Sequence, residues 1–240
     1  MRTIWNICYR DLNAFFSSLA AYILIILFLA LSGFFTWLYG SDIFFVGEAN
    51  LNTFFNTAFW TLFFFIPAIT MRSLAEEKKS GTLEWLVTHP VTDGQIVAGK
   101  WLACWLLVLI SLALTLPYYI TVAYLGPIDH GATIGGYLAL LLISAIYIGI
   151  GILASSTTTN QIVAYMIALF AGFVFHSLFD LISSTLTGSA ATMIAYLGTQ
   201  FHFENMARGV ISFDNVVYAT SLTIFALCLA TVNLKQRLWT

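Results

Sequence analysis

Charge is what this sequence has least of. Only 8% of its 240 residues are Asp, Glu, Lys or Arg, whereas 60% are hydrophobic and the mean hydropathy is +0.90. A soluble domain carries about 25% charged and 45–50% apolar residues, so this composition excludes an ordinary soluble protein. The formal net charge of −2 is too small to indicate a nucleic-acid partner. We therefore expect a protein of the lipid bilayer that binds no nucleic acid.

Cysteine is also scarce, and the residues of catalytic sites are scattered. Cys8, Cys104 and Cys228 are odd in number and lie in apolar surroundings, which predicts packing residues and no disulfide framework. The four histidines lack the spacing of metal ligands, and no nucleophile lies at a recognisable spacing from a base. We expect no metal, no cofactor and no catalytic residue in this chain.

Long apolar runs dominate what is present. A membrane-spanning helix needs about 20 predominantly apolar residues, and lipid leaves backbone groups unpaired in any open structure other than a helix. We therefore predict an all-α polytopic membrane protein, a single domain over residues 1–240 with six transmembrane helices. The predicted spans are 19–39, 54–70, 101–125, 134–154, 162–182 and 216–232.

The few basic residues predict the orientation of these spans. With six crossings, eight of the nine basic residues fall on one side of the membrane, and only Arg208 falls on the other. Because cytoplasmic loops carry the excess of Lys and Arg, both termini and the loop 71–100 are expected in the cytoplasm. The eight are Arg2, Arg10, Arg72, Lys78, Lys79, Lys100, Lys235 and Arg237.

The N-terminal residues 1–18 alternate apolar and polar side chains at helical spacing. Such a segment can lie in the plane of the lipid headgroups, so we predict an interfacial helix here. The other interpretation is a frayed extension of the first span.

The stretch GQIVAGKW, residues 94–101, nearly matches the G-x-x-x-x-G-K-[ST] loop that cradles phosphates. Trp101 stands where a Ser or Thr should hold Mg²⁺, and the stretch leads directly into an apolar run instead of lying between a strand and a helix. We instead interpret Thr92 and Gln95 as a capping box that opens a helix, and we expect no ATP site in this chain.

Residues 71–94, MRSLAEEKKSGTLEWLVTHPVTDG, hold over a third of all charged residues. After Ser80 and Gly81, the run 82–87 favours a short helix that Pro90 ends. A loop that mixes charge with exposed apolar residues suggests a docking site for a cytoplasmic partner. A solvated hairpin between two spans is the plainer interpretation.

The run MRSLAEEKKSGTLEWLVTHPVTDGQIVAGK, residues 71–100, resembles the cytoplasmic coupling loop of ABC-2-type transporter permeases. The segments PAITMRSLAEEKKSGTLE, NQIVAY and HFENMARGVISFDNVVY resemble in particular the gliding-motility-associated ABC permease subunits of Bacteroidetes. The resemblance covers nearly the whole chain. It implies the ABC-2 (type V exporter-like) permease fold and a bacterial inner-membrane location.

The resemblance also implies partners and site residues. Two copies of a separate ATP-binding subunit would bind the ATP and Mg²⁺, and a second permease subunit, identical or different, would complete the transporter. The expected contact with the ATPase consists of Glu76, Glu77, Lys78, Lys79, Ser80, Gly81, Thr82, Leu83 and Glu84. The complex would then export a solute or perform mechanical work on an envelope machine.

Other polar residues lie on the predicted outer side, in and around the segment 183–214, where the resemblance implies short helices. His176 and Asp180 are four residues apart, as are Glu204 and Arg208, which are spacings that favour pairing on a helix. We consider an outer gate, formed by these four residues and His202, beside a purely structural role. An ATP-independent channel, a secondary transporter or a membrane enzyme is the alternative function, which paired charges at mid-span would favour.

Overall fold

The computed structural model describes residues 2–39, 49–82 and 91–236, and all regular elements within these ranges are helical. Six stretches of helix are long and apolar enough to cross a membrane, which confirms the predicted all-α fold with six spans. They are Ala21–Leu38, Asn52–Ser80, Asp93–Leu125, His130–Thr157, Gln161–Thr185 and Phe213–Lys235.

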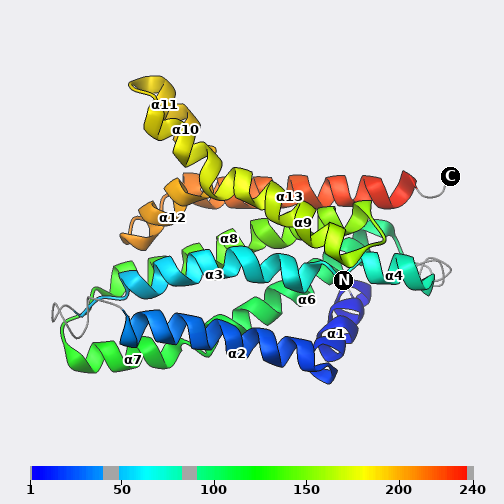
Figure 1. Ribbon diagram of the computed structural model, residues 1–240, viewed down its shortest axis with the longest axis horizontal. Helices are drawn as coiled ribbons and strands as arrows, with labels where there is room; N and C mark the ends of the chain where they lie inside the picture. Colours follow the sequence, from blue (N-terminus) through cyan, green and yellow to red (C-terminus); the bar gives the residue numbers. More distant parts are fainter. Residues whose placement is uncertain (1, 40–48, 83–90, 237–240) are drawn as a thin grey trace.

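The long helices lie side by side and are connected at the two ends of the molecule (Figure 1). In Figure 1, α1, α4 and the C-terminus lie toward one end, and α7 and α12 lie toward the other. The elements are α1 (Arg2–Ser17), α2 (Leu19–Gly33), η1 (Phe34–Leu38), α3 (Asn52–Thr70), α4 (Ala75–Ser80), α6 (Asp93–Ala113), α7 (Leu116–Leu125), α8 (His130–Thr157), α9 (Gln161–Phe173), η3 (Val174–Leu178), α10 (Phe179–Thr185), α11 (Ser189–Ala195), α12 (Thr199–Ala207) and α13 (Phe213–Gln236), where η1 and η3 are π-helical turns.

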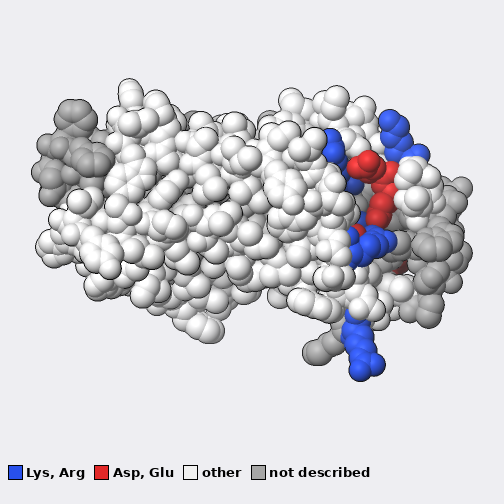
Figure 2. Space-filling model, turned by 90° about the horizontal axis from the view of Figure 1, so that it is seen from below, with Lys and Arg blue, Asp and Glu red and all other residues white. Residues whose placement is uncertain are grey.

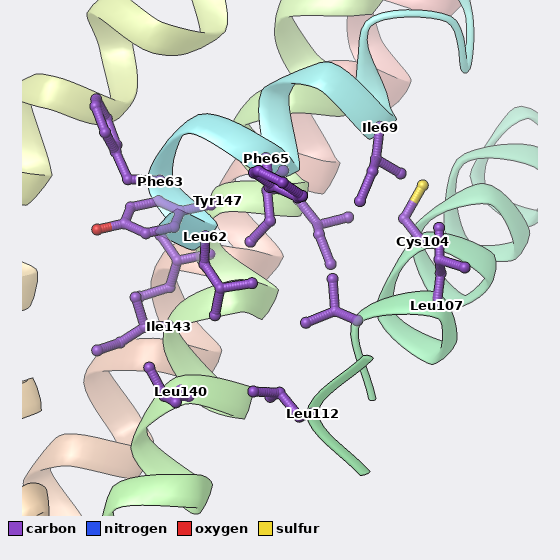
Figure 3. Packing of buried hydrophobic residues seen from close by; sticks show 14 of the residues in the cluster. Leu62, Phe63, Phe65, Ile69, Cys104, Leu107, Leu112, Leu140, Ile143 and Tyr147 are labelled. Carbon is purple, nitrogen blue, oxygen red and sulfur yellow. The ribbon is translucent and has the colours of Figure 1, made fainter. Parts of the chain in front are cut away.

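Helix α8 is the centre of the bundle. It packs against α3, α6, α9, α12 and α13, and leucine and isoleucine side chains from α3, α6 and α8 interlock in the core (Figure 3). Its small residues allow close approach: a Cβ on Gly149 would lie 3.2 Å from the Cβ of Ala226 in α13. The small-residue pattern of this span therefore serves packing within the chain.

The third span begins at Asp93, earlier than the predicted Trp101. The predicted capping box is present, with the Gln95 side-chain oxygen accepting a hydrogen bond from the Thr92 N–H at 3.2 Å. The span breaks between α6 and α7, where Pro117 lies in the first turn of α7, because proline cannot donate the backbone hydrogen bond that a continuous helix requires.

Helix α1 is separate from the first span. The backbone at Ser18 is extended, with φ −105° and ψ 147°, so α1 is not a continuous extension of α2, to which it runs at a steep angle (Figure 1). It packs mainly against α6, and its position in the headgroup plane stays a prediction.

The segment between the last two spans contains short helices. Helix α10, which forms the end of the fifth span, and helix α11 after it have no buried residue and project from the bundle (Figure 1). Helix α12, in contrast, buries Phe203 and Met206 against α8.

Candidate functional site

On the face of the molecule seen in Figure 2, the charged side chains gather at one end and the long flank shows none. We call this the charged end; it comprises α1, residues 71–82 with α4, and the first turns of α6. The concentration agrees with the charge asymmetry in the sequence, and we keep the prediction that this end faces the cytoplasm.

The short helix α4 has the charge order that a helix dipole favours. Glu76 and Glu77 lie in its first turn, and Lys78 and Lys79 lie in its last turn. Gly81 ends the helix in the left-handed conformation, with φ 70°, which glycine adopts without steric cost. The end of α4 and Thr82 are exposed, so this tip is open to a partner.

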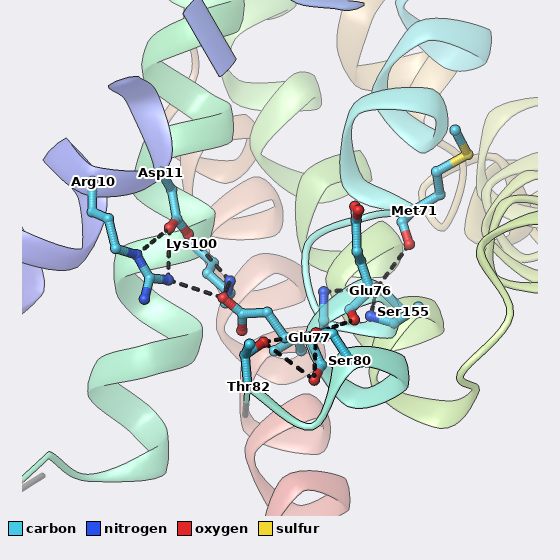
Figure 4. Close-up of polar contacts among 11 residues, drawn as sticks. Arg10, Asp11, Met71, Glu76, Glu77, Ser80, Thr82, Lys100 and Ser155 are labelled. Carbon is cyan, nitrogen blue, oxygen red and sulfur yellow. Dashed lines mark hydrogen bonds and ion pairs between the residues drawn. The ribbon is translucent and has the colours of Figure 1, made fainter. Parts of the chain in front are cut away.

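The start of α4 is fastened to α8 by a buried serine. The Ser155 hydroxyl accepts hydrogen bonds from the backbone N–H groups of Leu74 and Ala75, both at 3.0 Å, and donates to the Met71 carbonyl at 3.1 Å (Figure 4). The first N–H groups of a helix have no partner within the helix itself. Here a side chain of another helix supplies the partner, so α4 and α8 are joined.

Two further residues strengthen this junction. The Lys78 ammonium donates to the Ser156 carbonyl, and Asn233 of α13 donates from Nδ2 to the Ser156 hydroxyl at 3.3 Å. Ser155 and Ser156 lie in α8 and are buried. The last turn of α8 is thus the attachment point of α4.

A cluster of four charged residues joins α4 to α1 and α6 (Figure 4). One carboxylate oxygen of Glu77 lies 2.8 Å from Lys100 Nζ and 2.9 Å from Arg10 Nη2. Asp11 pairs with the same two cations, at 3.2 Å from Lys100 and 2.7 Å from Arg10. Lys100 is only 3% exposed, and two acids balance two bases, as buried charges require.

These pairings keep Arg10 charged. Burial lowers the pKa of its guanidinium, but the neighbouring Asp11 and Glu77 carboxylates outweigh that effect and raise the pKa above its ordinary value.

The second glycine of GQIVAGKW, Gly99, serves this same junction. Residues 94–100 lie within the helix α6, so they form no phosphate-cradling loop. A Cβ on Gly99 would lie 2.8 Å from the Ile7 side chain, so the glycine gives α1 room to approach α6. That approach brings Asp11 to Lys100.

The predicted ATPase-contact residues divide into two groups. Glu77 is 18% exposed and its carboxylate is engaged within the chain, and Lys78 is partly buried. Glu76, Lys79, Ser80, Gly81 and Thr82 are exposed. Leu83, Glu84 and the predicted helix 82–87 beyond Thr82 lie outside the described residues.

Sequence reasoning did not identify the partners of α4. Arg10, Asp11, Lys100 and Ser155 come from three helices, and no spacing in the sequence relates them to Glu77. The available signals were weak: a lysine at the edge of an apolar run, and an aspartate in an otherwise basic N-terminal segment.

On the opposite half of the bundle, His176 and Asp180 are not paired. His176 is fully buried, its Nδ1 lies 2.6 Å from the Tyr147 hydroxyl, and its Nε2 has no hydrogen-bond partner among the described residues. The Tyr147 hydroxyl is also 3.0 Å from the Thr199 hydroxyl. His176 lies in the π-helical turn η3, where the wider helix no longer aligns residues four apart.

The other outer residues are placed as follows. His202 is buried in α12, with Nδ1 2.7 Å from the Asn215 side chain and Nε2 3.0 Å from the Tyr196 carbonyl. Arg208 and Glu204 form the ion pair that their spacing predicts, at 3.5 Å. Because this pair is exposed, it contributes little to stability. Within the described part of the chain, no group of three metal-ligating side chains is close enough to hold a metal ion.

Comparison with protein families gives a match to the model described as ABC-2 family transporter protein, over residues 41–232. The match includes α4 and the helices from α3 into α13, and leaves out α1. A comparison with curated proteins finds no match.

Proposed function

The chain belongs to the ABC-2 family of transporter proteins, and on that premise we propose that α4 and its exposed tip couple the membrane spans to a separate ATP-binding subunit. Members of this family are transmembrane subunits without an ATP site of their own. The protein is therefore a multi-pass membrane permease of an ABC transporter complex that includes an ATPase subunit.

The observation that supports this coupling role is that one end of α4 is exposed while the other end is bonded to neighbouring helices. Its tip, from Lys79 to Thr82, is exposed, whereas its start is bonded to α8 through Ser155 and its Glu77 is paired with α1 and α6. The tip of α4 is accessible to a partner, and its other end is bonded to three helices. A displacement of the tip by a partner can therefore be transmitted to the bundle.

We further propose how the complex is assembled and which helices move when the ATPase subunits bind ATP. Two ATPase subunits hold ATP and Mg²⁺ and lie on the cytoplasmic side of a bacterial inner membrane, against the charged ends of two permease subunits. When ATP binding closes the ATPase pair, the displaced α4 moves α8 directly and moves α1 and α6 through the ion-pair cluster. Packed helices shift as rigid bodies in such transitions.

A narrower proposal concerns the work done by the complex. The likeness of residues 67–84 and 202–218 to gliding-motility-associated permeases suggests mechanical work on an envelope machine, and export of a solute is the other kind of work that the sequence leaves open. The family match covers ABC-2 transporters in general and does not support gliding in particular. ATP-dependent accumulation of a solute in inverted vesicles would contradict this narrower proposal and leave the coupling role intact.

Gly81→Val tests the coupling role. A β-branched residue is a conformational outlier at positive φ, so we expect the tip of α4 to change its course while the bundle stays folded. Co-purification of the ATP-binding subunit with the permease should fall several-fold, and so should the ATPase rate per permease.

Gly188→Val is the matched control. Gly188 also has positive φ, 79°, and at both glycines an added Cβ would meet no atom within 4 Å, but Gly188 caps α11 far from the charged end. It should leave ATPase binding unchanged. Equal losses in the two variants, or no loss in either, would contradict the proposed role of the α4 tip.

A further inference from the structure

A cavity of about 600 Å³ opens at the charged end, between α1, α2, the end of α3 and α6. This volume is within the range of small-molecule sites. One part of its wall is apolar and comes from the spans, with Leu24, Ile69 and Leu107 among its residues. The other part is charged and is formed by Asp11, Arg72, Glu76, Glu77 and Lys100.

The wall therefore matches an amphiphilic ligand, which has one apolar part and one charged part. It changes from apolar to charged where the apolar α3 ends at Thr70 and the polar residues 71–82 begin. This is the level at which lipid headgroups meet the ends of membrane spans.

Two of the charged wall residues are available to a ligand. Asp11, Glu77 and Lys100 neutralise one another together with Arg10. The side chains of Arg72 and Glu76 are exposed and form no ion pair with a described residue. Figure 4 shows Glu76 pointing away from the ion-pair cluster toward the end of α3. One wall thus presents a cation and an anion together.

Two buried polar atoms of the same wall point to hydrogen-bond donors on the ligand. Ser73 Oγ and Glu77 Oε2 are buried and have no hydrogen-bond partner among the described residues, and both residues line the cavity. Buried polar atoms in folded proteins nearly always have a partner. A carboxylate oxygen only accepts, so the group that satisfies Glu77 Oε2 must donate.

We propose that this cavity binds a phospholipid with a primary-ammonium headgroup, of the phosphatidylethanolamine type. Arg72 takes the phosphate, Glu76 takes the ammonium, and the acyl chain lies along Leu24, Ile69 and Leu107. The three ammonium hydrogens match the acceptors Glu76, Glu77 Oε2 and Ser73 Oγ. A trimethylammonium group cannot donate to them, and an anionic headgroup without an amine leaves Glu76 unpaired. The site does not depend on the proposed ATPase contact.

The test uses the full chain, purified in detergent and mixed with equal amounts of phosphatidylethanolamine and phosphatidylcholine of identical acyl chains. Lipid retained per protein is measured by native mass spectrometry. We expect phosphatidylethanolamine to be retained roughly tenfold or more over phosphatidylcholine, as loss of one hydrogen bond to a charged group predicts. Glu76→Gln should lower that ratio several-fold, while Glu77 Oε2 and Ser73 Oγ still accept hydrogen bonds from the ammonium.

Two variants separate the headgroup contacts. Arg72→Gln should weaken retention of both lipids and leave their ratio unchanged, because both carry the phosphate. Lys79→Gln changes an exposed charge of α4 that does not line the cavity, and it should leave both values as in the wild type.

Two outcomes overturn the proposal: equal retention of the two lipids by the wild type, or a preference that is undiminished in Glu76→Gln. A second measurement requires no variant. Successive N-methylation of the ethanolamine headgroup should lower retention stepwise, and a flat series would refute the assignment. Retention of phosphatidylglycerol equal to that of phosphatidylethanolamine would refute the role of the ammonium.

Discussion

Lys100→Met is expected to lower the free energy of unfolding by about 3 kcal/mol, the lower end of the range for removing one member of a buried ion pair. Lys100 is 3% exposed, whereas Asp11 and Glu77 are 16% and 18% exposed. Without the ammonium, two largely buried carboxylates share Arg10 alone. For a chain of 240 residues this corresponds to a fall of roughly 6–12 °C in Tm.

The matched control is Arg10→Met, in the same cluster. The Arg10 side chain is 44% exposed, so water screens its pairs and its loss should cost less than about 1 kcal/mol. Both variants can be compared with the wild type in detergent by thermal unfolding. An equal effect of the two substitutions would show that burial of Lys100 does not control the stability of the cluster.

A double variant isolates the pairing from the loss of the lysine itself. Adding Glu77→Gln to Lys100→Met removes the carboxylate that the first change leaves without its closest cation. We expect the double variant to recover part of the lost stability, because its charge cluster then contains only Arg10 and Asp11, which are 2.7 Å apart. Additive losses would mean that Glu77 and Lys100 are not energetically coupled.

Ser155→Ala is expected to cost about 2–3 kcal/mol and to detach the start of α4 from α8. The change leaves the buried N–H groups of Leu74 and Ala75 and the carbonyl of Met71 without the partner that Ser155 provides. Each buried polar group left unpaired costs about 1–3 kcal/mol, and local rearrangement can recover part of that loss. Amide hydrogen exchange at residues 74–78 should accelerate, and co-purification of the ATPase should fall.

Ser144→Ala is the control on the same helix. Ser144 is as fully buried as Ser155, but its hydroxyl donates only to the Leu141 carbonyl within α8. Its loss should cost well under 1 kcal/mol, because that carbonyl belongs to a regular helix. If Ser144→Ala and Ser155→Ala had the same effect on exchange at residues 74–78, the connection from α4 to α8 would not depend on the Ser155 hydroxyl.

The sequence predicted the spans well and their ends less well. The apolar runs identified all six spans. Lipid offers no hydrogen-bond partner to backbone groups, so a long apolar run in a bilayer has to pair them internally as a helix. The helix that contains the third span begins at Asp93, eight residues before the start of the predicted span. A charge marks a helix end only when it is solvated, and Lys100 lies within α6, where Asp11 and Glu77 neutralise it.

The position of the ATPase contact stays a prediction, and the internal arrangement of residues 71–82 could not be derived from the sequence. The charges of residues 71–82 drew attention to this segment in the sequence, and the structure adds that Gly81 ends α4 in the left-handed conformation. The distribution of roles could not be predicted. Glu76 and Glu77 are neighbours of the same residue type, yet Glu77 pairs with α1 and α6 while Glu76 lines the cavity.

By itself the sequence determined the membrane character, the six spans and the charged end, because these depend on local hydropathy, residue counts and helix caps. Only the tertiary structure decided which residues hold α4 and which leave it open. Ser155 lies 81 residues from Leu74, and Asp11 lies 89 residues from Lys100. Periodicity within a segment contains no information about which distant helix the segment packs against. That packing decides whether a charged side chain is buried in an ion pair or exposed to a partner.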